Sequence, residues 1–161
     1  MTSTTAPHTL FIDNRNVPGA TGETIAVIDP STAETFAHIA RGTAADIDRA
    51  VAAARRASDG AWGRMPAVER GRLLHRWGAL VDAHRDELAR LESRDTGKPI
   101  SQARADAGAL ARYFEFYGGA ADKLHGQTIP YQPGYTVLTV REAHGVTGHI
   151  IPWNYPMQIF G

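Results

Sequence analysis

An apolar run near the end of the chain limits the folds that the sequence can adopt. Residues 146–151, Val-Thr-Gly-His-Ile-Ile, are typical of a buried strand. Pro152 should end it, because proline cannot donate to a central ladder. Pro156 suits the first turn of a helix, but the sequence stops at Gly161. Since a buried parallel strand needs a crossover helix and a neighbouring strand, we expect an α/β fragment rather than a complete fold.

Asn154 lies in the predicted turn between this strand and this helix. In open α/β sheets, ligands bind at the carboxyl ends of the strands. An Asn amide at such a place can donate a hydrogen bond to a developing oxyanion. Asn is also a common helix cap, and for an isolated Asn-X-Pro the residues alone favour the cap. Both interpretations stay open at this point, with Asn154 as the main candidate for chemistry.

The apolar residues before Asn154 could form a platform for a cofactor ring and its ribose. They are Ile150, Ile151, Pro152 and Trp153. Taken alone, they are more simply interpreted as a core strand that ends in an aromatic residue. The usual Gly-x-Gly-x-x-Gly dinucleotide fingerprint is absent, because no third glycine follows Gly145 and Gly148 with that spacing.

The first forty residues predict short strands. Residues 9–13 and 23–28 flank a stretch rich in Asn, Pro and Gly, which suggests a hairpin-like layout. Residues 36–40 could form a third strand. Residues 1–8 contain no periodic apolar pattern, and we expect them to be disordered.

Four helices are expected to follow. Thr43 and Asp46 have the spacing of a capping box before the first helix. Pro66 suits the start of the second, Gly97 the end of the third, and Ser101 the cap of the fourth. Apolar residues recur at helical spacing in each segment. The predicted stripes are Ile47, Ala50, Val51 and Ala54; Leu73, Leu74, Trp77, Leu80 and Val81; Leu88 and Leu91; and Ala103, Ala107, Leu110, Ala111, Phe114 and Tyr117.

The composition argues against several classes of function. Lys plus Arg and Asp plus Glu both total 17, and this balance gives no footprint for nucleic acid or an anionic membrane. No apolar run approaches the roughly 18 residues that a membrane span needs. The N-terminus lacks the apolar core of a signal peptide, so we expect a cytoplasmic protein. The sequence contains no cysteine, which excludes disulfides and thiolate chemistry on these residues.

The sequence resembles the aldehyde dehydrogenase superfamily at residues 150–156, where Pro-Trp-Asn is followed by an aromatic residue and Pro. Further blocks resemble the family in the same order along the chain. They are residues 11–14, 29–34, 50–55, 70–74, 95–99, 113–123 and 126–130. The turn at 29–34 departs from the family pattern, with Asp29 and Ala33 in place of Asn and Gly. An ordered set of blocks over residues 10–161 is more specific than any single motif.

The resemblance implies a Rossmann-like cofactor domain, a catalytic domain and an oligomerisation arm. Residues 9–124 would be the N-terminal part of the cofactor domain. Residues 125–142 would be the arm, in which 126–130 and 135–140 are extended. Residues 143–161 would supply the first strand and the helix start of the Rossmann-like sheet, with the catalytic domain absent. The full-length protein would be a homodimer or a homotetramer.

The family mechanism is covalent. A cysteine thiolate attacks the aldehyde to give a thiohemiacetal, hydride passes to the nicotinamide, and a glutamate activates water to hydrolyse the thioester. By the resemblance, Asn154 is the oxyanion donor, residues 150–153 contact the cofactor, and Tyr155 and Ile159 lie near the substrate tunnel. Positions that hold a monovalent cation in some members are Val27, Ile28 and Asp95. NAD is the expected cofactor, although NADP is not excluded.

The leading hypothesis is therefore a parent protein that oxidises an aldehyde to a carboxylic acid with NAD+. In the family order, the nucleophile and the general base lie beyond Gly161. One alternative is a catalytically inert fragment that acts only in subunit association, which the absence of cysteine favours for these residues. The other is a parent that makes acyl-CoA from a semialdehyde by the same covalent start.

Overall fold

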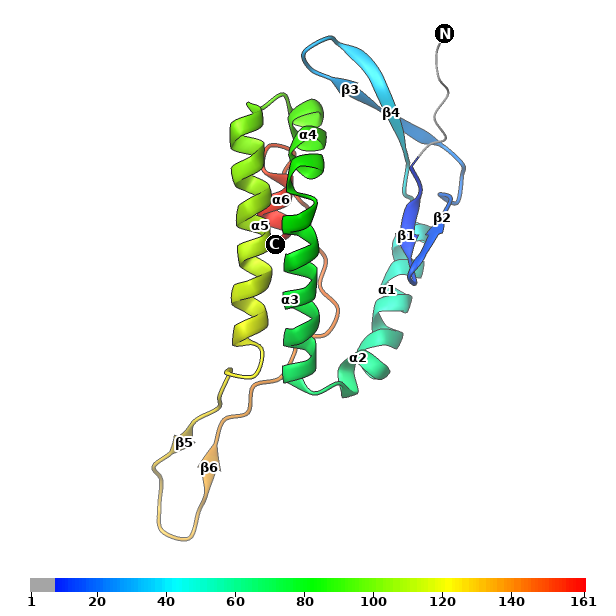
Figure 1. Cartoon of the computed structure of the whole chain (residues 1–161). Helices are drawn as coiled ribbons and strands as arrows, with labels where there is room; N and C mark the ends of the chain where they lie inside the picture. The colour runs from blue at the N-terminus through cyan, green and yellow to red at the C-terminus, as the bar shows by residue number, and fades with distance from the viewer. Residues whose placement is uncertain (1–7) are drawn as a thin grey trace.

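The structure is a computed structural model that describes residues 8–161 (Figure 1). Over these residues the chain forms six helices and six short strands. The helices are α1 (Ala44–Asp59), α2 (Ala61–Arg64), α3 (Ala67–Ala83), α4 (Arg85–Thr96), α5 (Ile100–Ala120) and α6 (Pro156–Phe160). The strands are β1 (Leu10–Ile12), β2 (Arg15–Val17), β3 (Thr24–Asp29), β4 (Glu34–Ala40), β5 (Thr128–Ile129) and β6 (Val137–Leu138).

Each strand pairs with its neighbour along the chain in an antiparallel ladder of two: β1 with β2, β3 with β4, and β5 with β6. The expected pairing of residues 9–13 with 23–28 is therefore wrong. Asp13 and Asn14 both have positive φ, 56° and 58°, which matches a type I′ turn. They lead the chain directly into β2, inside the stretch that the sequence suggested was a loop. The strand predicted at 36–40 is confirmed as part of β4.

Asp46 joins the start of α1 to the connection between β2 and β3. The predicted capping box is confirmed, since the Thr43 backbone N–H donates to Asp46 Oδ2 at 2.9 Å. Asp46 also accepts hydrogen bonds from the Ala20 backbone N–H and from Arg49, and it is only 1% exposed. The hydrogen bonds from Thr43 and Ala20 hold the pKa of Asp46 well below its usual value.

Helices α3 and α5 lie side by side (Figure 1), and glycines allow their close approach. A Cβ on Gly71 of α3 would lie 2.4 Å from the Gly118 carbonyl oxygen of α5. Gly118 and Gly119 weaken the helical pattern in the sequence, yet α5 continues through both of them to Ala120. Since the distance between two helix axes depends on the side chains at their contact, glycine at this crossing lets the backbones meet.

The core lies between α3, α4 and α5. Its buried members are Val81, Leu110, Ala111 and Phe114, with Leu74, Leu88 and Met157 packed against them. The predicted stripes are thus confirmed in part. The other part is wrong for the described chain, in which the exposed members of the stripes include Ile47, Trp77, Leu80, Leu91 and Tyr117.

The helix ends follow the turn chemistry of the sequence with one exception. Gly97 ends α4 in the left-handed conformation with φ 76°, and its N–H donates to the Ser93 carbonyl at 2.9 Å. Helix α5 begins at Ile100 with Pro99 at its cap position. Ser101 therefore lies inside the first turn, and the prediction that it caps this helix is wrong.

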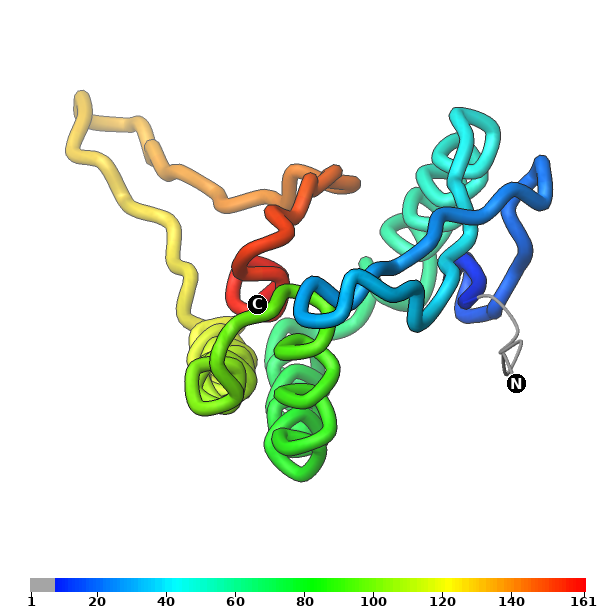
Figure 2. The backbone as a smooth tube through the Cα atoms, turned by 90° about the horizontal axis from the view of Figure 1, so that it is seen from above, coloured from blue at the N-terminus to red at the C-terminus, as the bar shows by residue number. Residues whose placement is uncertain are grey.

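The C-terminal quarter contains the β5–β6 hairpin, which projects away from the helices (Figure 1). Beyond it, the strand predicted at 146–151 is not formed. These residues have no ladder partner in the described chain, and Ile150 is fully exposed. Strand pairing requires a neighbouring row of N–H and C=O groups, which residues 8–161 do not offer there. The predicted helix start at Pro156 is confirmed, and Figure 2 shows that the chain returns to place α6 against α5.

At the other end, the disorder predicted for residues 1–7 lies outside the described residues. For His8 the prediction is wrong, because its backbone pairs alongside β4. The His8 N–H donates to the His38 carbonyl and the His8 carbonyl accepts from the Ala40 N–H, both at 2.8 Å. Among residues 8–161, no helix has both the length and the apolar character needed to cross a membrane.

Candidate functional site

Apolar contacts anchor α6 on α3 and α5. Phe160 packs edge-on against Trp77 and Phe114, with ring centroids 5.8 and 6.3 Å apart. Trp77 and Phe114 stack on each other at 4.5 Å, and Met157 packs against the core. Aromatic pairs with these geometries add to the stabilisation from burial. They fix α6, and with it the turn that carries Asn154, beside the connection between α4 and α5.

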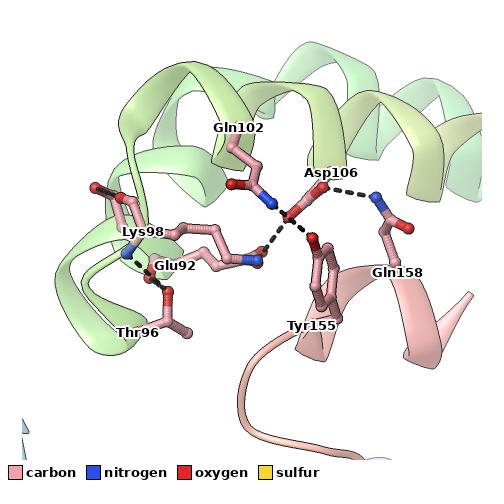
Figure 3. A network of polar contacts seen from close by, with 8 residues as sticks. Glu92, Thr96, Lys98, Gln102, Asp106, Tyr155 and Gln158 are labelled. Atoms are coloured by element: carbon pink, nitrogen blue, oxygen red, sulfur yellow. Dashed lines mark hydrogen bonds and ion pairs between the residues drawn. The ribbon is translucent and has the colours of Figure 1, made fainter.

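Polar contacts hold the same turn from the other side (Figure 3). The Gln102 side chain donates to the Tyr155 hydroxyl at 2.7 Å. The Lys98 ammonium lies 4.3 Å from the centroid of the Tyr155 ring, within the range of a cation–π contact. One turn of α6 further on, Gln158 donates to Asp106 Oδ1 at 2.6 Å. Both flanks of Pro156 are therefore tied to α5 and to the loop before it.

A buried ion cluster supports these contacts. Lys98 Nζ pairs with Asp106 Oδ2 at 2.6 Å and with Glu92. The three side chains are 9%, 3% and 2% exposed, in the order Lys98, Asp106 and Glu92. Two backbone carbonyls of the same region also have partners: Thr96 Oγ1 donates to the Glu92 carbonyl, and Ser93 Oγ donates to the Lys98 carbonyl. These contacts tie the α4–α5 loop, over which the Tyr155 ring lies, to both helices.

The cluster holds two carboxylates and one ammonium. Burial raises the pKa of Glu92 above its usual value, and the hydrogen bond and charge of Lys98 offset this only in part. Burial works against the charge of Lys98 too, but its bonds to Asp106 and Glu92 outweigh that effect and raise the pKa of Lys98. Glu92 Oε2 is buried and has no hydrogen-bond partner in the described chain. Burial and the missing partner therefore both favour the protonated form of Glu92.

Asn154 is exposed, and its side chain makes no hydrogen bond within residues 8–161. The cap position of α6 belongs to Tyr155, and no side chain caps this helix. The helix-cap interpretation of Asn154 is therefore wrong. What remains is an amide that no hydrogen bond within residues 8–161 satisfies, directly before a tyrosine that Gln102 and Lys98 hold.

The proposed cofactor residues form an open apolar surface rather than a core strand. Ile150, Pro152 and Trp153 are exposed, and Ile151 is half-buried. Ile151 lines an apolar groove together with Trp77 and Phe160. The interpretation of these residues as a buried core strand is wrong for the described chain, whereas an open surface of this kind fits an apolar platform.

The structure separates the expected cation positions. Val27 and Asp95 line one cavity of about 430 Å³ together with Glu92 and Phe36. Ile28 is exposed and does not line it. The β3–β4 register shifts between Val27 and Ile28, so the backbone is irregular at this point. No group of three or more His, Asp or Glu side chains with metal-binding geometry occurs within residues 8–161.

The ion cluster itself is missing from the sequence-based predictions. A signal for it was present, because Asp106 falls within the apolar stripe of α5, beside Ala103, Ala107 and Leu110. Carboxylates are seldom fully buried unless they are paired. An acid in such a stripe therefore indicates a buried cation, and Lys98 is one of only two lysines in the sequence.

Comparisons with known proteins identify the family of the chain. The model of the aldehyde dehydrogenase family matches residues 17–161. The chain belongs to the aldehyde dehydrogenase family. It is 47% identical over 154 residues to the mitochondrial benzaldehyde dehydrogenase of Antirrhinum majus, covering 94% of this chain and 29% of that protein. It is 49% identical over 156 residues to the mitochondrial aldehyde dehydrogenase family 2 member B4 of Arabidopsis thaliana, covering 95% and 29%.

Solved aldehyde dehydrogenase structures confirm the fold. A putative aldehyde dehydrogenase from Burkholderia cenocepacia superposes with a TM-score of 0.93 at 67% identity, covering 96% of this chain and 32% of that one. The NAD+ complex of an aldehyde dehydrogenase from Bacillus cereus gives 0.93 at 37% identity, with the same coverage. The chain thus spans about a third of the length of these relatives and forms the N-terminal part of the aldehyde dehydrogenase fold, as the resemblance predicted.

Proposed function

We propose that the full-length aldehyde dehydrogenase carrying this segment oxidises an aldehyde to a carboxylic acid with NAD+. One observation carries the role of this chain: Asn154 presents an unsatisfied amide directly before Tyr155, the first of the α6-side residues that are tied to α5 and to the loop before it. The family membership and the NAD complexes among similar aldehyde dehydrogenase structures support the choice of reaction and cofactor.

In this proposal the Asn154 amide donates a hydrogen bond to the oxygen of the aldehyde carbonyl as negative charge develops on it. A donor placed where the negative charge develops stabilises the transition state more than the ground state. The contacts of Tyr155 and Gln158 place the backbone that carries this donor. The thiol that attacks the carbonyl comes from outside these 161 residues, which contain no cysteine. Tyr155 and Ile159 are proposed to lie near the substrate entrance.

NAD+ supplies the hydride acceptor when it is bound. The residues of this chain that fit it are Ile150, Ile151, Pro152 and Trp153. Their open apolar surface can pack against the rings of a dinucleotide without hydrogen-bond specificity. In this proposal they place the cofactor next to the turn that carries Asn154.

The test is the Asn154→Ala variant of the full-length enzyme, assayed for NADH production with a panel of aldehydes. We expect kcat to fall by roughly 10²–10³, the usual effect of removing one oxyanion donor. Asn16→Ala is the matched control, because Asn16 is exposed on the distant strand β2, and it should retain wild-type kcat. An unchanged kcat in Asn154→Ala would refute the oxyanion role.

We also propose that Asp95 and the backbone of Val27 and Ile28 contribute to a monovalent-cation site. Val27 and Asp95 share one cavity, and backbone carbonyl oxygens coordinate K+ in proteins. Titration of the full-length protein with K+ and Na+, followed by thermal denaturation, tests this site. The wild type should gain thermal stability and Asp95→Ala should not, and an equal gain in both would exclude the site.

Two further properties of the full-length protein are proposed. The hairpin of residues 125–142 exposes large side chains, including Tyr131, Tyr135 and Val140, which supports its use as an arm in a homodimer or homotetramer. Light scattering should show monomers after deletion of this arm, and an unchanged mass would refute the assignment. Cytoplasmic location stays a prediction, to be checked by fractionation, and a mitochondrial location like that in the names of two plant relatives would contradict it.

A further inference from the structure

We propose that Lys98 is a positioning residue for the Asn154 turn, acting through Tyr155, Asp106 and Gln158. This inference rests on the proposed oxyanion role of Asn154. Lys98 touches both the ring next to Asn154 and the carboxylate that holds Gln158, the residue three positions further on.

The position of the Asn154 backbone depends on the contacts of the residues that follow it, Tyr155 and Gln158. The Asn154 side chain has no hydrogen bond of its own within residues 8–161, so its position follows the backbone of the turn. Directly after Asn154, Tyr155 lies under the Lys98 ammonium and accepts a hydrogen bond from Gln102. Three residues further on, Gln158 is bound to Asp106, whose second oxygen pairs with Lys98 (Figure 3).

The choice of residue points to the same role. Only two of the 17 basic residues are lysines. Lys123 is exposed and pairs with its chain neighbour Asp122, whereas Lys98 is buried with two carboxylates. A compact ammonium with three donors can serve two carboxylates and lie over a ring at once, which the planar fork of an arginine does less well. Without the charge, both Tyr155 and Asp106 lose their common partner.

The chemical consequence is a loss of alignment rather than a loss of a reacting group. A misplacement of about 1 Å in a catalytic group can cost roughly 10²-fold in rate. Lys98 touches neither the proposed cofactor platform nor the exposed Asn154 side chain. Its removal should therefore lower kcat through Asn154 and leave the binding of NAD+ nearly unchanged.

A double-mutant cycle on the full-length enzyme tests this coupling. Wild type, Lys98→Met, Asn154→Ala and the double variant are compared by kcat, by the KM for aldehyde and by the Kd for NAD+. We expect Lys98→Met to lower kcat by roughly 10–100-fold alone and by less than about threefold when Asn154 is already alanine, because residues that act as one unit are not additive. Lys98→Arg should recover part of kcat, and Lys123→Met should match the wild type.

The outcomes separate the two proposals. If Asn154→Ala lowers kcat but Lys98→Met acts by the same factor in both backgrounds, the positioning role is overturned and the oxyanion role stands. If Asn154→Ala leaves kcat unchanged, both are overturned. Should Lys98→Met fail to fold, Gln102→Ala takes its place in the cycle, because Gln102 is only partly buried and donates to the Tyr155 hydroxyl. Additivity of Gln102→Ala with Asn154→Ala would then overturn the proposal.

Discussion

Replacing Lys98 by methionine should destabilise the folded chain by about 3–5 kcal/mol, the usual cost of removing one partner from a buried ion pair. The burial of the two carboxylates explains this cost. Asp106 and Glu92 are 3% and 2% exposed, so water cannot replace the lost ammonium. Asp106 would keep one donor from Gln158, and Glu92 would keep none, since its Oε2 already lacks a partner.

Glu92→Gln should behave differently because it removes the surplus negative charge. The folded pKa of Glu92 is raised above its ordinary value of 4.5. The contribution of Glu92 to stability is therefore fully present below pH 4.5 and is lost as the pH rises through the folded pKa. In the glutamine variant, the free energy of unfolding does not decrease with pH for this reason, because the side chain cannot ionise. Relative to wild type, Glu92→Gln should thus become more stable as the pH rises from 4.5 to neutrality.

Urea denaturation of the full-length protein, followed by far-UV circular dichroism at pH 4.5, 6 and 7.5, measures both effects. At pH 7.5 the Lys98→Met curve should have a much lower midpoint, since a domain of this kind has only about 5–15 kcal/mol of stability. Protonation of Glu92 removes one of the two carboxylate charges that Lys98→Met leaves unpaired, so the loss of stability in this variant should be smaller at pH 4.5. The reasoning is refuted if Lys98→Met costs less than Glu92→Gln at pH 7.5, or if the Glu92→Gln difference does not change with pH.

The remaining predictions concern the elements that hold this region in place. Gly71→Ala should destabilise the chain by about 1–3 kcal/mol because its Cβ would meet the Gly118 carbonyl. Gly119→Ala should stabilise it by about 0.5–1 kcal/mol, since nothing lies within 4 Å of that Cβ. Thermal denaturation of both variants measures the two shifts, and equal shifts would contradict the close crossing. Asp46→Asn should lower the denaturation midpoint at pH 7, because the pKa of Asp46 is lowered in the folded state and its carboxylate therefore stabilises the fold above pH 3.8. This stabilisation is lost as the pH falls through the folded pKa, so the effect of Asp46→Asn should shrink below pH 3.8. Exposed Asp48→Asn is the control, and a pH-independent loss in Asp46→Asn would contradict the assignment.

Local signals in the sequence predicted the elements whose chemistry is local. The capping box of Thr43 and Asp46, the left-handed Gly97 and the helix start at Pro156 all depend on residues within four positions of one another. Periodicity found the buried face of α5. These features need no knowledge of distant partners, and the structure confirms them.

Features that depend on distant partners were harder to predict. One local feature was missed as well: the pairing of β1 with β2 depends on positive φ at Asp13 and Asn14, two residues that also suit an ordinary loop. The strand at 146–151 has the right residues but no neighbour to pair with in the described chain. Trp77 and Leu80 have helical spacing yet stay exposed, because burial depends on what covers a face and not on its pattern.

The candidate site was found in part. Asn154 stood out through its place in a strand-to-helix turn, but the residues alone favoured a cap, and only the resemblance pointed to an oxyanion donor. Lys98 lay within a matched block and received no role, because its partners Glu92 and Asp106 are six and eight residues away on two different helices. A three-dimensional cluster of this kind leaves only an indirect trace, the acid in an apolar stripe.

Rapid mixing of the full-length Asn154→Ala enzyme with NAD+ and aldehyde, recording NADH formed in the first turnover, tests the oxyanion role most directly. The rate constant for this turnover should fall by roughly 10²–10³ relative to wild type, while the Kd for NAD+ stays within about twofold. A first-turnover rate equal to that of the wild type, or a weakening of NAD+ binding that accounts for the whole decrease, would contradict the role of Asn154 as oxyanion donor.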